Sequence, residues 1–174
     1  MVSGREDAPA AGVFGFLTVW DAAGAGTFGG YLLVDLSGRP LEFHCTAPVR
    51  VTRAQEILYG ATLNRQLHGE QIGGPLLKAT AVKPVAVLTD RDSLLHARSH
   101  SPSPVAVVRR GVEPLVGGDS SDLVFGGFAV QLHGDDADRL EAVRPQLTAL
   151  ADSIELVEPF ERIQAAIEEA QRHS

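Results

Sequence analysis

The chain has 174 residues, which suits one ordinary domain with a sizeable core of its own. It is 44% hydrophobic and 21% charged, a globular composition that excludes a disordered chain, a collagen-like chain and a disulfide scaffold. No apolar run reaches the roughly 18–20 residues that span a bilayer, so we expect no membrane partner. Cys45 is the single cysteine and the first residues lack the apolar core of a signal peptide, which predicts a cytoplasmic protein.

The formal net charge of -7 is distributed unevenly along the chain. Residues 1–87 hold seven basic and seven acidic side chains, so residues 88–174 hold the other eight basic and fifteen acidic ones. Binding to nucleic acid needs clustered Lys and Arg, and no such stripe is visible in the sequence. We therefore expect no nucleic-acid partner. The acidic half suits a basic protein partner, or simply keeps the chain soluble.

The first part of the chain predicts a three-strand antiparallel meander. After a flexible tail over residues 1–12, runs of β-branched and aromatic residues predict strands at 13–20, 27–36 and 41–46. Residues 21–26 and 37–40 supply the turn chemistry between these strands.

The remainder of the chain alternates between predicted helices and strands. This order predicts an α+β fold with a largely antiparallel sheet, helices packed mainly on one side and an amphipathic C-terminal helix. We expect a single domain over residues 13–174, with a sub-boundary near 111–122, where a glycine-rich loop is predicted. The expected helices cover 53–59, 61–67 and 70–81 and begin again near 135 and 158, and the expected strands cover 84–89, 105–108 and 123–132.

Positions 24–29 read G-A-G-T-F-G, which matches the spacing of a dinucleotide-binding loop. Such a loop must lead into a helix whose N-terminus holds the pyrophosphate. Here a predicted strand follows instead, so we interpret the segment as a hairpin connection and expect no cofactor.

The third predicted strand carries polar residues on one face only. Glu42 and His44 alternate with Leu41, Phe43 and Cys45, and successive side chains of a strand point to opposite faces. Cys45 is therefore predicted to be a buried small hydrophobe rather than a nucleophile beside His44. Glu42 and His44 form part of a polar site if their face lines a groove, and otherwise belong to an exposed sheet face.

Two carboxylates, Asp90 and Asp92, follow the apolar strand predicted at 84–89. Ligands of α/β proteins often bind at the carboxyl ends of strands, where paired carboxylates can bind Mg²⁺ or share acid–base work. The same residues can equally cap the next turn, and Asp135 and Asp136 pose the same choice at a later strand end. The six histidines show no metal-binding spacing, so we expect no metal site.

These patterns favour one function and leave an alternative. The favoured hypothesis is a non-catalytic cytoplasmic binding or interaction module. It is either a sensor of a small-molecule ligand or a subunit of an assembly. As a subunit, it would dock through its C-terminal helix on a protein partner or on a second copy of itself. The alternative is a small hydrolase or transferase that uses Asp90 and Asp92 together with Glu42 and His44. Convergence of those four side chains around one pocket would favour the enzyme.

Overall fold

The computed structural model describes residues 12–111, 122–125 and 127–173. The tail predicted over residues 1–12 and the loop and sub-boundary predicted near 111–122 therefore fall almost wholly outside the described residues.

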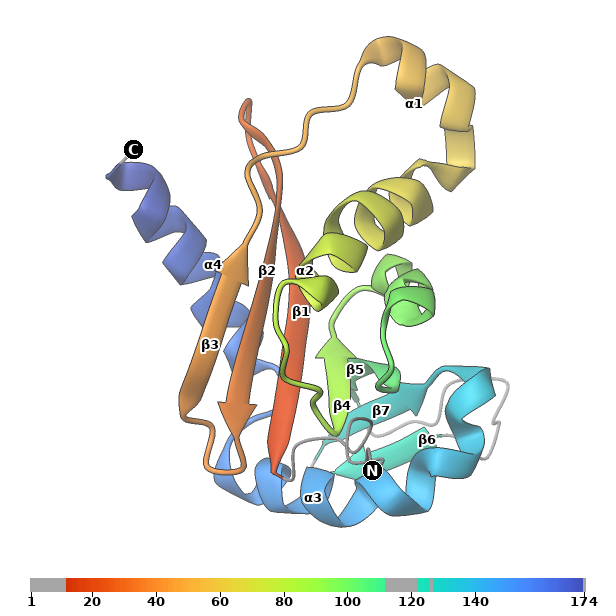
Figure 1. Cartoon of the computed structure of the whole chain (residues 1–174), viewed down its shortest axis with the longest axis vertical. Helices are drawn as coiled ribbons and strands as arrows, with labels where there is room; N and C mark the ends of the chain where they lie inside the picture. Colours follow the sequence, from red (N-terminus) through yellow and green to blue (C-terminus); the bar gives the residue numbers. More distant parts are fainter. Residues whose placement is uncertain (1–11, 112–121, 126, 174) are drawn as a thin grey trace, which may run out of the picture.

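A seven-stranded sheet in the order β3-β2-β1-β4-β5-β7-β6 forms the centre of the molecule (Figure 1). The predicted antiparallel meander of β1, β2 and β3 is confirmed. β4 then pairs in parallel with β1, and β5 in parallel with β4, so the centre of the sheet is parallel. The strands are β1 (Val13–Ala22), β2 (Gly26–Asp35), β3 (Pro40–Cys45), β4 (Ala86–Thr89), β5 (Val105–Arg110), β6 (Asp122–Phe125) and β7 (Phe128–Leu132).

The last predicted strand, 123–132, is a hairpin rather than one continuous strand. β6 and β7 pair antiparallel with Phe125 opposite Phe128, and β7 pairs with β5. Gly127 lies in the turn with a φ of 92°, a left-handed conformation that glycine adopts without a steric penalty. Two apolar runs joined by glycine therefore fold back on each other.

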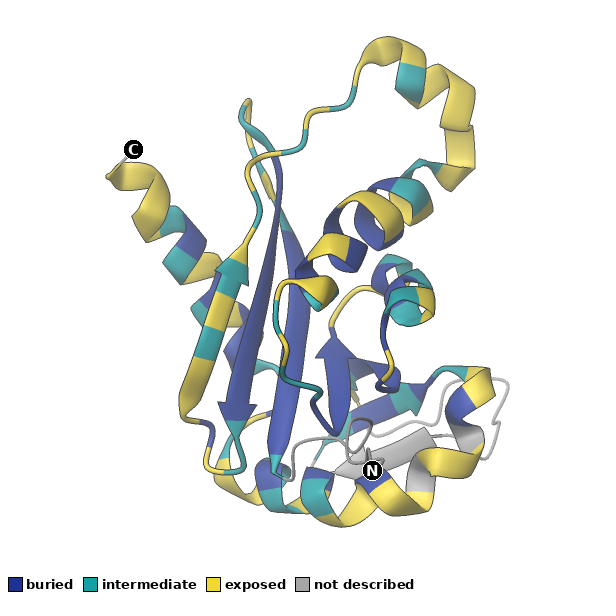
Figure 2. Cartoon of the chain, in the orientation of Figure 1, coloured by how far each residue is buried: buried dark blue, intermediate teal, exposed yellow. Residues whose placement is uncertain are grey.

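Helical segments cover both faces of the sheet, although helices were expected mainly on one side. The long helices α3 (Leu140–Ser153) and α4 (Glu158–Arg172) pack on one face, against residues such as Phe16 and Leu88. The opposite face carries Leu17 and Val87, and shorter helical segments cover it. Because the central strands are apolar on both faces, both faces need cover, and Figure 2 shows these strands as buried. The covering segments are η2 (Arg65–Gly73), α2 (Gly74–Lys78) and η3 (Asp92–His100).

The other helical segments are short. α1 (Arg53–Tyr59) begins with a complete capping box, in which Thr52 and Gln55 bond to each other's backbone. It continues through η1 (Gly60–Thr62) toward η2 and stands away from the sheet (Figure 1). η4 (Gly134–Arg139) leads into α3. Among the described helices none is long and apolar enough to cross a membrane.

The glycines of β2 bring helices close to the sheet on both of its faces. A Cβ atom on Gly29 would lie 2.1 Å from Cγ2 of Ile72 in η2, and one on Gly30 would lie 2.2 Å from Cγ2 of Ile163 in α4. The G-A-G-T-F-G segment is a hairpin connection, as predicted, and Gly29 within it allows close packing.

Candidate functional site

The Asp90 cleft is a cavity of about 250 Å³ beyond the carboxyl end of β4, where its parallel pairing with β1 ends. The crevice beyond the carboxyl ends of parallel strands is where open sheets commonly bind ligands. Polar and charged side chains from three parts of the sheet and from α4 line this cleft together with apolar ones. Its lining consists of Thr18, Val19, Trp20, Asp90, Arg91, Arg110, Val157, Phe160, Glu161 and Gln164.

Asp90 is held in place by Thr18 on the neighbouring strand. The parallel register pairs Leu17 with Thr89, so Thr18 and Asp90 are the next residues along each strand. The Thr18 hydroxyl donates a hydrogen bond of 2.6 Å to Oδ1 of Asp90. Thr18 is buried, whereas 32% of the Asp90 side chain is exposed, so the carboxylate is both fixed and accessible.

Two arginines line the Asp90 cleft, each beside a carboxylate. Nε of Arg91 lies 3.9 Å from Oδ1 of Asp90, and its Nη2 donates to the Val19 carbonyl at 3.5 Å. Arg110, at the end of β5, lies over the Phe128 ring at 5.5 Å and forms an ion pair of 3.7 Å with Glu155. Planar guanidinium groups suit phosphate oxygens, which they bind through paired N–H donors.

Helix α4 and Trp20 complete the walls of the cleft. Phe160 packs edge-to-face on Phe16 of β1, with the ring centroids 5.4 Å apart, and this contact fixes the first turn of α4 against the sheet. The following turn presents Glu161 and Gln164 to the cleft. Trp20 stacks on Phe28 at 5.8 Å and is itself half-buried, so part of its ring is available to a ligand.

The residues of the cleft do not fit a metal cluster. Two-metal sites hold their ions with several carboxylates, whereas the side chain that faces Asp90 from β1 is the hydroxyl of Thr18. Within the part of the chain that the structure describes, no three His, Cys, Asp or Glu side chains are grouped so as to hold a metal ion. We therefore derive no chemical step through a metal.

The four predicted site residues do not come together. Glu42 and His44 lie on the edge strand β3, three strand spacings or about 14 Å from β4. The Glu42 carboxylate accepts a hydrogen bond from the Thr80 hydroxyl, and Asp92 forms an ion pair with Arg109. Asp90 alone of the four lines the cleft.

Cys45 was predicted to be buried, and the structure places it on the exposed part of the edge strand. Leu41 and Phe43, which share its face, are 49% and 39% exposed. The alternation of the strand was predicted correctly, but α4 does not extend far enough across β3 to cover this face.

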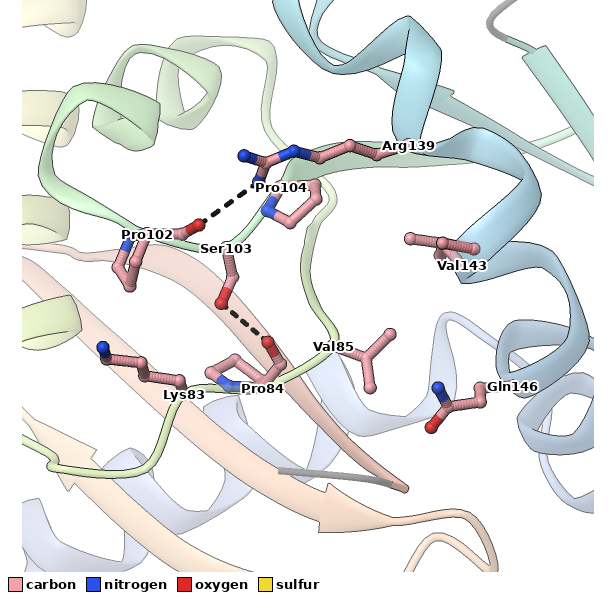
Figure 3. Close-up of a pocket in the computed structure, with 10 residues that line it drawn as sticks. Lys83, Pro84, Val85, Pro102, Ser103, Pro104, Arg139, Val143 and Gln146 are labelled. Carbon is pink, nitrogen blue, oxygen red and sulfur yellow. Dashed lines mark hydrogen bonds between the residues drawn. The ribbon is translucent and has the colours of Figure 1, made fainter. Parts of the chain in front are cut away.

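A second cavity of about 390 Å³ lies at the opposite, amino ends of β4 and β5 (Figure 3). Its polar groups bond largely to the chain itself: the Ser103 hydroxyl donates to the Pro84 carbonyl at 2.6 Å, and Arg139 donates to the Pro102 carbonyl at 3.3 Å. Its lining contains no carboxylate. The Asp90 cleft is thus better equipped for acid–base chemistry.

The α+β fold class predicted from the sequence is confirmed: β1–β3 are antiparallel, β1, β4 and β5 are parallel, and helices pack against the sheet. No protein-family model matches the chain, and no curated protein matches it in sequence. Solved structures are similar at low identity and with TM-scores below 0.5, so no residue role is carried over from them.

Three of these structures illustrate the similarity. Argonaute of Marinitoga piezophila with a guide RNA is 15% identical, with a TM-score of 0.44 over 82% of this chain, which spans 26% of that one. The catalytic domain of human Endonuclease V is 16% identical, with a TM-score of 0.48 over 92% of this chain and 82% of that one. Endonuclease V of Ciona intestinalis with DNA is 10% identical, with a TM-score of 0.42 over 93% of this chain and 87% of that one.

These findings correct two expectations from the sequence. A non-catalytic module without a nucleic-acid partner was expected, whereas the similar structures are an endonuclease catalytic domain and two proteins in complex with RNA or DNA. The charge argument considered only basic residues that are close together in the sequence. Arg91 and Arg110 are nineteen positions apart in the chain, and the parallel sheet brings both to one cleft.

Proposed function

We propose that the protein is a hydrolase that acts on a nucleic-acid strand, with the Asp90 cleft as its active site. The observation that carries this proposal is the Asp90 carboxylate, fixed by Thr18 beyond the carboxyl end of β4 and flanked by Arg91 and Arg110. A general base must be fixed, reachable and close to the group that binds the substrate, and Asp90 meets these conditions.

The lining suits one nucleotide unit of a single strand. Arg91 and Arg110 are the phosphate-binding groups, because guanidinium donors match phosphate oxygens. The exposed part of Trp20 offers a flat surface on which a base can stack, and Gln164 can donate to and accept from a base edge. The cleft volume of about 250 Å³ is too small for a duplex, which favours a single strand.

The proposed reaction uses Asp90 as the general base. Asp90 takes a proton from a water molecule as the water oxygen bonds to phosphorus, and the bond from phosphorus to the leaving sugar oxygen breaks. The leaving oxygen takes its proton from solvent. The two guanidinium groups stabilise the negative charge that builds on the phosphoryl oxygens.

The experiment is cleavage of end-labelled single-stranded RNA and DNA by the full chain and by Asp90→Asn. We expect the wild-type chain to cleave at least one of the two strands, and Asp90→Asn to bind with similar affinity but cleave about 100-fold or more slowly. Asp152→Asn on α3 is the matched control for loss of a carboxylate and should cleave as the wild type does. Binding without cleavage by the wild-type chain would refute the hydrolytic step, and absence of binding would refute the proposal as a whole.

A further inference from the structure

A serine and a histidine form a close pair outside the Asp90 cleft, on the other face of the sheet. Nδ1 of His68 in η2 lies 2.6 Å from Oγ of Ser93 in η3. Glycines make this approach possible, because a Cβ on Gly69 would lie 3.0 Å from Cβ of His96, and one on Gly73 2.9 Å from Cβ of Ala97. At these two glycines, η2 and η3 therefore pack more closely than residues with a Cβ atom would allow.

The histidine is buried, as suits a general base, and the serine is more exposed, as suits a nucleophile that must reach a substrate. His68 is 8% exposed, whereas Ser93 is half-buried and lines an open cavity of about 420 Å³. Burial lowers the pKa of His68, so the ring is neutral at neutral pH and able to accept a proton. Two nearby charges act on the same ring in opposite senses: Asp21, at the end of β1, raises its pKa and Arg91 lowers it.

This arrangement matches the logic of an activated serine. A nucleophilic hydroxyl needs a base within about 2.6–3.2 Å, and a third group that stabilises the protonated base. Ser93 and His68 supply the hydroxyl and the base from η3 and η2, while the Asp21 carboxylate at the end of β1 accepts a hydrogen bond from the Thr27 hydroxyl. Unlike a capping serine, Ser93 directs its hydroxyl to the histidine and faces a cavity large enough for a small substrate.

The cavity also indicates the charge of the substrate. Arg65 lines it together with Asn64 and His96, and Nε of Arg65 donates to Nε2 of His96 at 3.1 Å, which holds the guanidinium at the cavity wall. Asp92 lies in the same lining but forms an ion pair with Arg109. The wall therefore suits an anionic group on the substrate.

We propose that Ser93 is the nucleophile and His68 the general base of a second hydrolytic site, which cleaves esters whose acyl part carries a negative charge. This activity goes beyond the action on nucleic acid proposed for the Asp90 cleft. His68 Nδ1 takes the Ser93 proton as Oγ bonds to the acyl carbon. The ester C–O bond then breaks, and the alcohol leaves with the proton from His68. His68 then takes a proton from water as the water oxygen bonds to the acyl carbon. The bond from that carbon to Oγ breaks, the acid leaves, and His68 returns the proton to Oγ of Ser93.

A fluorophosphonate probe tests the nucleophile directly, because it labels activated serines covalently. We expect mass spectrometry of the labelled full chain to place the probe on Ser93, and Ser93→Ala to remove the label. Ser99→Ala, an exposed serine of the same helical segment, is the matched control and should label as the wild type does. Label on other residues, or none on the folded chain, would overturn the proposal.

Two further variants test the base and the substrate charge. His68→Asn keeps a polar atom near Ser93 but cannot act as a base, so labelling should slow about 100-fold while circular dichroism shows a folded chain. Unchanged labelling of this variant would contradict the role of His68. The wild type should hydrolyse the p-nitrophenyl monoester of succinate about tenfold faster than p-nitrophenyl acetate. Arg65→Gln should abolish this preference, and equal rates for the two esters in the wild type would refute an anionic substrate.

Discussion

Replacing Gly30 by alanine should displace α4 and disturb the Asp90 cleft. Gly30 lies opposite Thr18 in the β1–β2 pair, and its added Cβ would lie 2.2 Å from Cγ2 of Ile163, a residue that is 1% exposed. The contact is far inside van der Waals range, so the helix must move. Overpacking of this kind costs about 1–3 kcal/mol. For a chain of this size, that corresponds to a fall in Tm of about 2–12 °C.

Thermal unfolding followed by circular dichroism measures this effect, with Gly134→Ala as the matched control. A Cβ atom on Gly134 would meet nothing within 4 Å beyond its chain neighbours, and the φ of Gly134 is not positive, so alanine there should change stability by less than about 0.5 kcal/mol. Ile163→Ala removes the clashing atom, so the double variant should lose less stability than the two single losses combined. A Gly30→Ala chain as stable as Gly134→Ala, or strictly additive losses, would refute the packing argument.

Three further predictions follow from other contacts. Asp136 is 1% exposed and accepts hydrogen bonds of 2.6 and 2.8 Å from Arg98. Asp136→Ala should therefore lower the free energy of unfolding, measured in urea, by about 3 kcal/mol. A loss below about 1 kcal/mol would contradict this prediction. Burial lowers the pKa of His68, so the unfolded chain binds more protons than the folded chain at acidic pH. The free energy of unfolding should therefore fall as the pH drops below about 6.5, the pKa of a free histidine. If the urea midpoint of His68→Asn showed the same pH dependence as that of the wild type, this role of His68 would be contradicted. Strand cleavage should persist in EDTA, because the proposed step uses the Asp90 carboxylate held by the Thr18 hydroxyl, and its loss on chelation would disprove the proposed step.

The parts of the fold set by local chemistry were predictable from the sequence. Turn residues and alternation identified the meander of β1, β2 and β3, and the acidic amphipathic pattern identified α4. The helices predicted at 61–67 and 70–81 overlap η2 and α2, but their position on the second sheet face was not predicted, because η2 and η3 lack the regular apolar spacing of an amphipathic α-helix. Their packing depends on glycines such as Gly69 and Gly73, whose role is visible only in the folded chain.

In the candidate site, too, only the residue with a local sequence signal was predicted. Asp90 could be found because a carboxylate directly after a buried strand is a local signal. Thr18, its partner, is 72 positions away, and its one signal in the sequence is a hydroxyl in an otherwise apolar strand. Glu161 and Gln164 reach the cleft only through the packing of α4 on β1, which no local pattern records. No local pattern indicates the role of Asp136 either: it was predicted as a possible helix cap, and the structure places it in a buried ion pair with Arg98.

Trp20 offers the most direct test of binding in the Asp90 cleft, since it is the only tryptophan in the sequence and lines that cleft. We predict that titration with a single-stranded oligonucleotide quenches its fluorescence in a saturable way, because a base stacks on the indole. Arg110→Gln should weaken this binding, while the exposed Arg172→Gln should not. A rise in oligonucleotide anisotropy with unchanged Trp20 emission would place the strand elsewhere, and no change in either signal would contradict the proposed function.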